Sequence, residues 1–155
     1  MTKFYPVAVI LFLLICVAAI VMAGGRLAYF LSIPSLLVVV VSALVMSLAN
    51  FRLGEIGRAF ALAFRSSGSR AAADRGELEK ALAFFDALLR YLLIAGLVGT
   101  MIGTITMLGN LGNVERIGRG SALALTTIFY ALLLWVLVVV PGRTGIRQKL
   151  AELEE

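Results

Sequence analysis

The chain has 155 residues, of which 61% are hydrophobic, and its formal net charge is +5. Its mean hydropathy is +1.03, and a core of this size cannot bury so many apolar residues. This excludes an ordinary soluble domain and predicts a single membrane domain over residues 1–155. The basic residues lie in loops between apolar runs, so the charge indicates membrane orientation and not a nucleic-acid partner.

The first predicted membrane helix covers about residues 5–24. It contains an uninterrupted apolar run over residues 7–23, preceded by Phe4 and Tyr5 as interfacial aromatics. With these residues the run is long enough to span a bilayer.

A cleaved signal peptide is the alternative for this segment. Lys3 precedes the apolar run, and Val21-Met22-Ala23 could serve as a cleavage site. The run is longer than the usual signal-peptide core, so an uncleaved helix is favoured. The single cysteine, Cys16, lies inside the run and is interpreted as a packing residue. The chain has no histidine, and no metal or cofactor is expected.

The second helix is predicted over about residues 33–65. Pro34 suits a first helical turn, where its missing N–H needs no partner. The apolar run over residues 36–49 is short, and helical spacing of apolar residues continues beyond Phe51. The helix is therefore expected to leave the bilayer and to continue as an amphipathic cytoplasmic arm.

The third helix is predicted over about residues 76–108, after a Ser/Gly-rich break at residues 66–69. Its first part is also amphipathic, and it enters the membrane without a helix breaker. The two amphipathic arms are expected to pair as an antiparallel hairpin. The pattern alone favours a solvated extension over a docking surface.

A polar loop is predicted over residues 109–120, followed by a fourth membrane helix at about 120–141 that Pro141 ends or kinks. The tail at 142–155 is charged and helical. The expected fold is thus all-α, with four transmembrane helices in two hairpins.

Four spans place both termini and the 51–90 segment on one side of the membrane. Eleven basic residues lie on that side: Lys3, Arg52, Arg58, Arg65, Arg70, Arg75, Lys80, Arg90, Arg143, Arg147 and Lys149. Three lie on the other: Arg26, Arg116 and Arg119. The positive-inside rule makes the larger set, and both termini, cytoplasmic.

Small residues are concentrated in the third helix. Gly96, Gly99 and Gly103 would allow a neighbouring helix to approach closely, and the last two have the Gly-x-x-x-Gly spacing of membrane helix contacts. Thr100 and Thr104 lie one turn apart on one side of the same helix.

Two further threonines, Thr126 and Thr127, lie in the fourth helix at a depth comparable with Thr100 if the two helices are antiparallel. A threonine hydroxyl can bond to its own helix and serve only packing, or it can line a pore. For any one threonine both interpretations remain open; the paired set favours an ion pathway.

No catalytic constellation is present, and an enzyme is not expected. All acidic and basic residues lie outside the four apolar runs. A proton or cation relay normally places an ionisable group inside the membrane. If the chain conducts ions, a partner must therefore supply the carboxylate.

Several segments resemble the MotA/TolQ/ExbB proton-channel family, and within it the flagellar stator subunit. The resembling segments are residues 96–103, 107–111, 117–118, 122–127, Tyr130 and Pro141, with weaker likeness at 22–25 and 33–39. The resemblance implies a pentamer around two copies of a single-span partner, whose transmembrane aspartate carries the ion. It also implies that Thr100 lines the ion path and that Pro141 lies at the cytoplasmic end of the fourth helix.

Three departures refine this resemblance. Ile128 stands where the family has its more general threonine, beside Thr127. Ala122 and Leu123 stand where the ExbB and TolQ branch has a glutamate. The region at about 51–90 is much shorter than the rotor-engaging domain of flagellar stators, so flagellar torque is not expected.

The sequence therefore predicts an ion-conducting subunit, for protons or sodium, of a stator-like motor in a bacterial inner membrane. The resemblance implies that ion motive force drives the motor and that the subunits form a homo-pentamer around a partner with one aspartate-bearing span. The alternative is a non-conducting scaffold protein assembled through small-residue helix packing.

Overall fold

The computed structural model describes residues 5–24, 30–64 and 74–154. In chain order the helices are α1 (Tyr5–Met22), α2 (Ile33–Asn50), α3 (Leu53–Phe64), α4 (Arg75–Leu108), α5 (Val114–Leu134), the π-helical turn η2 (Trp135–Val139) and α6 (Val140–Ala151). The described part of the chain contains no strand, and the predicted all-α class is confirmed. The predicted break at 66–69 lies outside the described residues.

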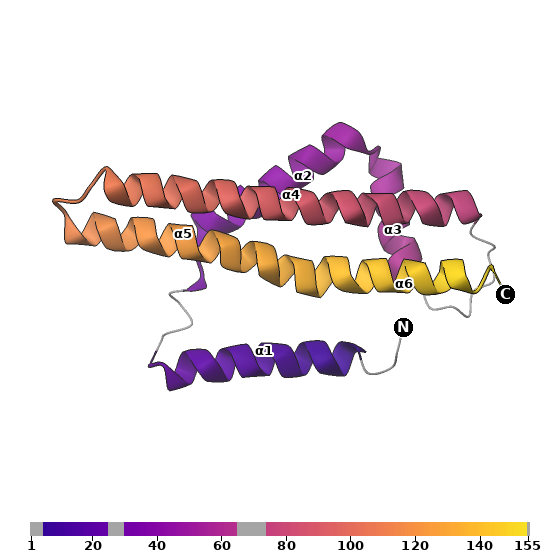
Figure 1. The fold of residues 1–155 in the computed structure, drawn as a ribbon, viewed down its shortest axis with the longest axis horizontal. Coiled ribbons are helices and arrows are strands. Elements are labelled where there is room, and N and C mark those ends of the chain that lie inside the picture. Colours follow the sequence, from indigo (N-terminus) through magenta and orange to yellow (C-terminus); the bar gives the residue numbers. More distant parts are fainter. Residues whose placement is uncertain (1–4, 25–29, 65–73, 155) are drawn as a thin grey trace.

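The longest helix, α4, pairs antiparallel with the continuous helix formed by α5, η2 and α6 (Figure 1). The connection between α4 and α5 is shorter than the predicted polar loop at 109–120. Helix α5 already begins at Val114, because the side chain of Asn113 accepts a hydrogen bond from the Arg116 N–H at 3.1 Å and caps the first turn.

The fourth predicted helix does not end at Pro141. The chain continues as helix through it, and the turn before it widens, so that the Val140 N–H bonds to the Trp135 carbonyl, five residues back. A proline inside an α-helix clashes with the carbonyl four residues earlier. The π turn η2 lies where this clash has to be relieved.

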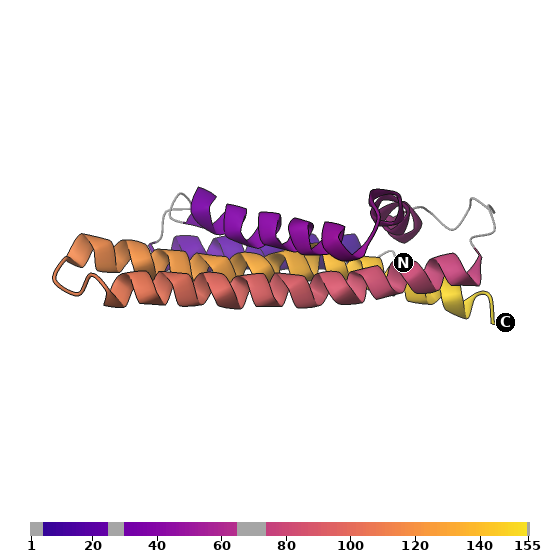
Figure 2. The ribbon, with the colours of Figure 1, turned by 90° about the horizontal axis from the view of Figure 1, so that it is seen from above.

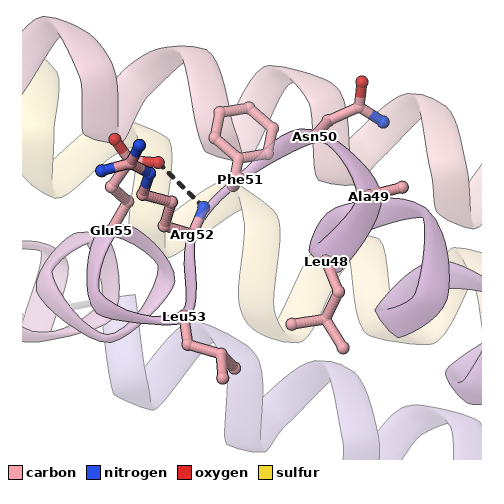
Figure 3. Close-up of a pocket in the computed structure, with 7 residues that line it drawn as sticks. All are labelled: Leu48, Ala49, Asn50, Phe51, Arg52, Leu53 and Glu55. Carbon is pink, nitrogen blue, oxygen red and sulfur yellow. Dashed lines mark hydrogen bonds between the residues drawn. The ribbon is translucent and has the colours of Figure 1, made fainter.

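The second predicted helix is two helices, and the prediction of one continuous helix over 33–65 is wrong. Phe51 has an extended backbone, and its ring packs edge-on against Phe84 with centroids 5.4 Å apart. The next residue, Arg52, donates its backbone N–H to the Glu55 carboxylate at 2.9 Å, which caps α3 (Figure 3). A core contact and a cap on adjacent residues thus turn the chain.

The two amphipathic segments do pack together, as α3 on α4 and α6. The predicted antiparallel hairpin is wrong, because α3 crosses α4 and does not run alongside it (Figures 1 and 2). The ring of Phe60 lies 5.7 Å from that of Phe84 and 5.5 Å from that of Phe85. At the edge, the Lys149 ammonium of α6 donates to the Leu62 carbonyl at 2.6 Å. The rings of Phe60, Phe84 and Phe85 form an aromatic core that joins α3 to the part of α4 that packs on α6.

Three helices in the described residues are long and apolar enough to cross a membrane: α2, α4 and the continuous helix over Val114–Ala151. Helix α1 contributes a shorter apolar stretch, Val7–Met22. The arrangement of four spans in two hairpins therefore stays a prediction, with α1 as the undecided span.

Candidate functional site

A seam of small residues between α4 and α5 brings these two helices into close contact. A Cβ placed on Gly103 would lie 2.4 Å from the Ala124 nitrogen and 2.7 Å from the Gly120 carbonyl oxygen. On Gly99 it would lie 2.6 Å from the Thr127 methyl group, and on Gly96 2.7 Å from the Ala131 Cβ. The three glycines thus let the two backbones approach.

The register of this pair is constant along its whole length. Gly99 faces Thr127 in α5, and at the other end Gly142 of α6 faces the ring of Phe85 in α4, whose Cε1 lies 2.4 Å from where a Gly142 Cβ would be. The extra residue in η2 does not interrupt the pairing. Each residue of α4 that faces the seam therefore has a defined neighbour on the antiparallel helix.

The hydroxyl of Thr100 joins the two helices. It lies 2.8 Å from the Gly96 carbonyl of its own helix and 3.0 Å from the Ala124 carbonyl of α5. One turn further on, Thr104 donates to the Thr100 carbonyl at 2.8 Å. Both side chains are half-buried, and neither is enclosed by the described part of the chain.

Thr126 lies on a different side of α5. Its hydroxyl is 2.7 Å from the Ala122 carbonyl and 2.5 Å from the hydroxyl of Ser35, at the start of α2. Ser35 is fully buried and is also 2.8 Å from the Ser32 hydroxyl. Thr126 is thus part of the contact that holds α2 on α5.

Thr127 lies in the α4–α5 seam with no exposed surface. Its hydroxyl is 3.0 Å from each of two carbonyls of its own helix, those of Leu123 and Ala124. Its methyl group fills the space over Gly99. In this arrangement the Thr127 hydroxyl contacts its own helix and not a surface.

The side of the α4–α5 pair opposite α2 is uncovered in the described structure, and α2 and α3 lie on the other side (Figure 2). Ile128 is two residues from Thr126, a rotation of about 200° around the helix, which places it opposite the α2 contact. On α4, Thr100 and Thr104 continue at four-residue steps the row that begins with Gly96, whose added Cβ would touch Ile128 at 3.3 Å. We call Thr100, Thr104 and Ile128 the open face.

No charged residue lies between Arg90 and Glu115 of the sequence, or between Arg119 and Arg143. The ionisable groups nearest to these apolar stretches on the α6 side include Asp86 and Arg143, an ion pair with its nitrogen and oxygen 2.6 Å apart. The apolar stretches of α4 and α5, which contain the open face, therefore offer hydroxyl oxygens to an ion but no carboxylate.

Sequence reasoning missed Ser35 as the partner of Thr126. The readable signal was a row of small residues every four positions, because Ser35, Val39, Ala43 and Ser47 are the buried residues of α2. Such a row predicts a close helix contact but not which helix it meets.

Comparison with curated proteins gives no match to this chain. The family model of the MotA/TolQ/ExbB proton channel family matches residues 57–155, which include α4, α5, η2 and α6. The segments at 22–25 and 33–39 lie outside the matched range. The match covers well over half of the chain and includes the seam and the open face, so this multi-pass membrane protein belongs to the MotA/TolQ/ExbB proton channel family.

Proposed function

We propose that the chain is the ion-conducting subunit of a stator-like motor driven by ion motive force. Copies of it form a ring, expected to be a pentamer, around a single-span partner that supplies the ion-carrying aspartate. The ring lies in a bacterial inner membrane with both termini of each copy cytoplasmic. Helix α1 also crosses the membrane, so that each copy has four spans. The ion is a proton or sodium.

The observation that carries this proposal is the open face. It is the uncovered side of the α4–α5 pair, and it contains the side chains of Thr100 and Thr104 and no charged residue. Since each hydroxyl donates its hydrogen to a helix carbonyl, the lone pairs of its oxygen have no donor within the described chain. Lone pairs accept hydrogen bonds from water or hydronium and can ligate a metal cation, which suits a path wall beside a partner carboxylate.

Within this proposal, Thr100 and Thr104 line the path. Thr126 and Thr127 were predicted to do so as well, and that role stays a prediction. Their contacts with Ser35 and Gly99 support a different contribution, in which they hold α2 and α4 in place behind the open face.

Subunit counting tests the ring. The tagged full-length chain would be purified from its native membrane in mild detergent and measured by native mass spectrometry. Five copies together with copies of one single-span chain bearing a membrane aspartate are the expected result. A monomer or dimer, under conditions that keep a known oligomer intact, would contradict the ring.

Thr100→Val is expected to abolish most of the ion flux while the oligomer persists, because valine keeps the shape of threonine and removes the oxygen from the open face. Flux is measured with pH- and sodium-sensitive dyes in vesicles from cells that express the chain with its neighbouring genes. Thr106→Val is the matched control, since the exposed Thr106 hydroxyl bonds only to the Ile102 carbonyl of its own helix. Equal flux in wild type and Thr100→Val would contradict the role of Thr100.

The second candidate is a non-conducting scaffold, and the seam supports it. Gly96, Gly99 and Gly103 are all used in packing against α5, and every threonine hydroxyl of α4 has a carbonyl partner in the chain. A scaffold predicts that Thr100→Val changes nothing, whereas glycine substitutions in the seam disrupt assembly.

A further inference from the structure

The π turn η2 leaves one helix carbonyl without a backbone donor. In an α-helix the Val136 carbonyl would bond to the N–H of Val140, but that N–H is directed to Trp135 instead. The next possible donor along the helix is residue 141, which is proline and has no N–H. An unpaired carbonyl inside a membrane is strongly unfavourable, because no water is present there to bond it.

The missing hydrogen bond comes from the first turn of α1. The hydroxyl of Tyr5 donates to the Val136 carbonyl at 2.8 Å, across 131 positions of the sequence. Among the described residues it is the one hydrogen bond that joins α1 to another helix.

Apolar packing does little to fix the rotation of α1 about its own axis. Most of its large side chains are exposed in the chain, including Ile10, Leu14 and Val21 at 59%, 59% and 62%. Lipid tails are as apolar as these side chains, so burial in a membrane does not determine which side of α1 faces the protein. A directional hydrogen bond can determine that side.

The positions of the half-buried residues of α1 agree with this contact. They form one row at three- and four-residue steps that starts at Tyr5: Tyr5, Val9, Leu13, Cys16 and Ile20. The row that faces the rest of the chain is thus the row that contains the donor hydroxyl.

We infer that Tyr5 is a positioning residue that sets the rotation and depth of α1 by capping the carbonyl that Pro141 leaves free. Pro141 and Tyr5 then act as one unit although they lie at opposite ends of the chain. The proline creates the acceptor, and the tyrosine uses it. This inference does not depend on which ion is conducted or on the number of subunits.

The chain contains its own reporter, because Cys16 is its single cysteine and lies on the inward row of α1. Tyr5→Phe keeps the ring and removes the hydroxyl. We expect the rate at which a membrane-permeant maleimide labels Cys16 in native membranes to rise by roughly threefold or more. Tyr91→Phe, which removes a hydroxyl without a hydrogen-bond partner in the described structure, should leave that rate unchanged.

A second background separates this role from general loosening. In Pro141→Ala, residue 141 regains its N–H and the turn can close into an α-helix, so that the Val136 carbonyl has a helical donor. Tyr5→Phe should then cause no further rise in Cys16 labelling. An unchanged rate in Tyr5→Phe alone, or the same rise in both backgrounds, would overturn the inference.

Discussion

Gly103→Ala is expected to destabilise the α4–α5 pair by about 2–3 kcal/mol, a large effect for one added methyl group. The new Cβ would lie 2.4 Å from the Ala124 nitrogen and 2.7 Å from its Cα. These are backbone atoms, so no change of side-chain rotamer relieves the contact. The two helices must separate, and the hydrogen bond from Thr100 to the Ala124 carbonyl is lost with them. The midpoint of unfolding in a denaturing-detergent titration measures the change.

Gly118→Ala is the matched control for this prediction. Gly118 also lies in α5, but a Cβ placed on it meets nothing within 4 Å. Since alanine is the better helix former, this variant should be neutral or more stable by up to about 1 kcal/mol. If the two alanine variants unfold at the same midpoint, the seam does not depend on close backbone approach.

Phe85→Ala is expected to reduce the free energy of unfolding by about 3–5 kcal/mol. Phe85 has no exposed surface, and its ring packs against those of Phe60 and Phe84 at centroid distances of 5.5 and 5.2 Å. Removing it opens a cavity where α3, α4 and α6 meet. The same detergent titration applies, with Phe64→Ala as control: Phe64 stacks only on Phe60, is 52% exposed, and should lose less than about 1 kcal/mol.

Coupling between Phe85 and Gly142 makes this prediction more specific. Gly142→Ala alone should be destabilising, because its Cβ would overlap the Phe85 ring. In the Phe85→Ala background the ring is gone, and the added methyl group partly fills the cavity. Gly142→Ala should therefore be harmless or stabilising there. An equal loss in both backgrounds would show that the contact does not limit the packing of α6.

The sequence predicted the helices whose signals are local. The third predicted helix, 76–108, differs from α4 by one residue at its start, because Asp74 and the Ser/Gly-rich stretch before it leave few other starting points. The break at Phe51 was missed because its causes are a ring contact with Phe84 and the cap from Glu55. The first of these is a tertiary contact, and no periodicity reports it.

In the candidate site, too, features set by local sequence could be predicted and features set by tertiary contacts could not. The glycine spacing predicted close packing of α4, and Thr100 and Thr104 could be assigned to one side of that helix. The sides on which Thr126 and Thr127 lie could not be predicted, since they depend on whether α2 or α4 occupies each side of α5. The hydrogen bond from Thr126 to Ser35 and the packing of Thr127 on Gly99 decide this.

The constant register of α4 with α5, η2 and α6 has a mechanical consequence. With 34 residues, α4 is about 51 Å long, whereas the hydrocarbon layer of a bilayer is about 30 Å thick. The pair is thus a stiff lever that extends well beyond the lipid. A tilt of about 5° around one end displaces the other end by about 4 Å. A small displacement beside the threonines therefore reaches the aromatic core as a motion the size of a side chain, without any change in the internal packing of the lever.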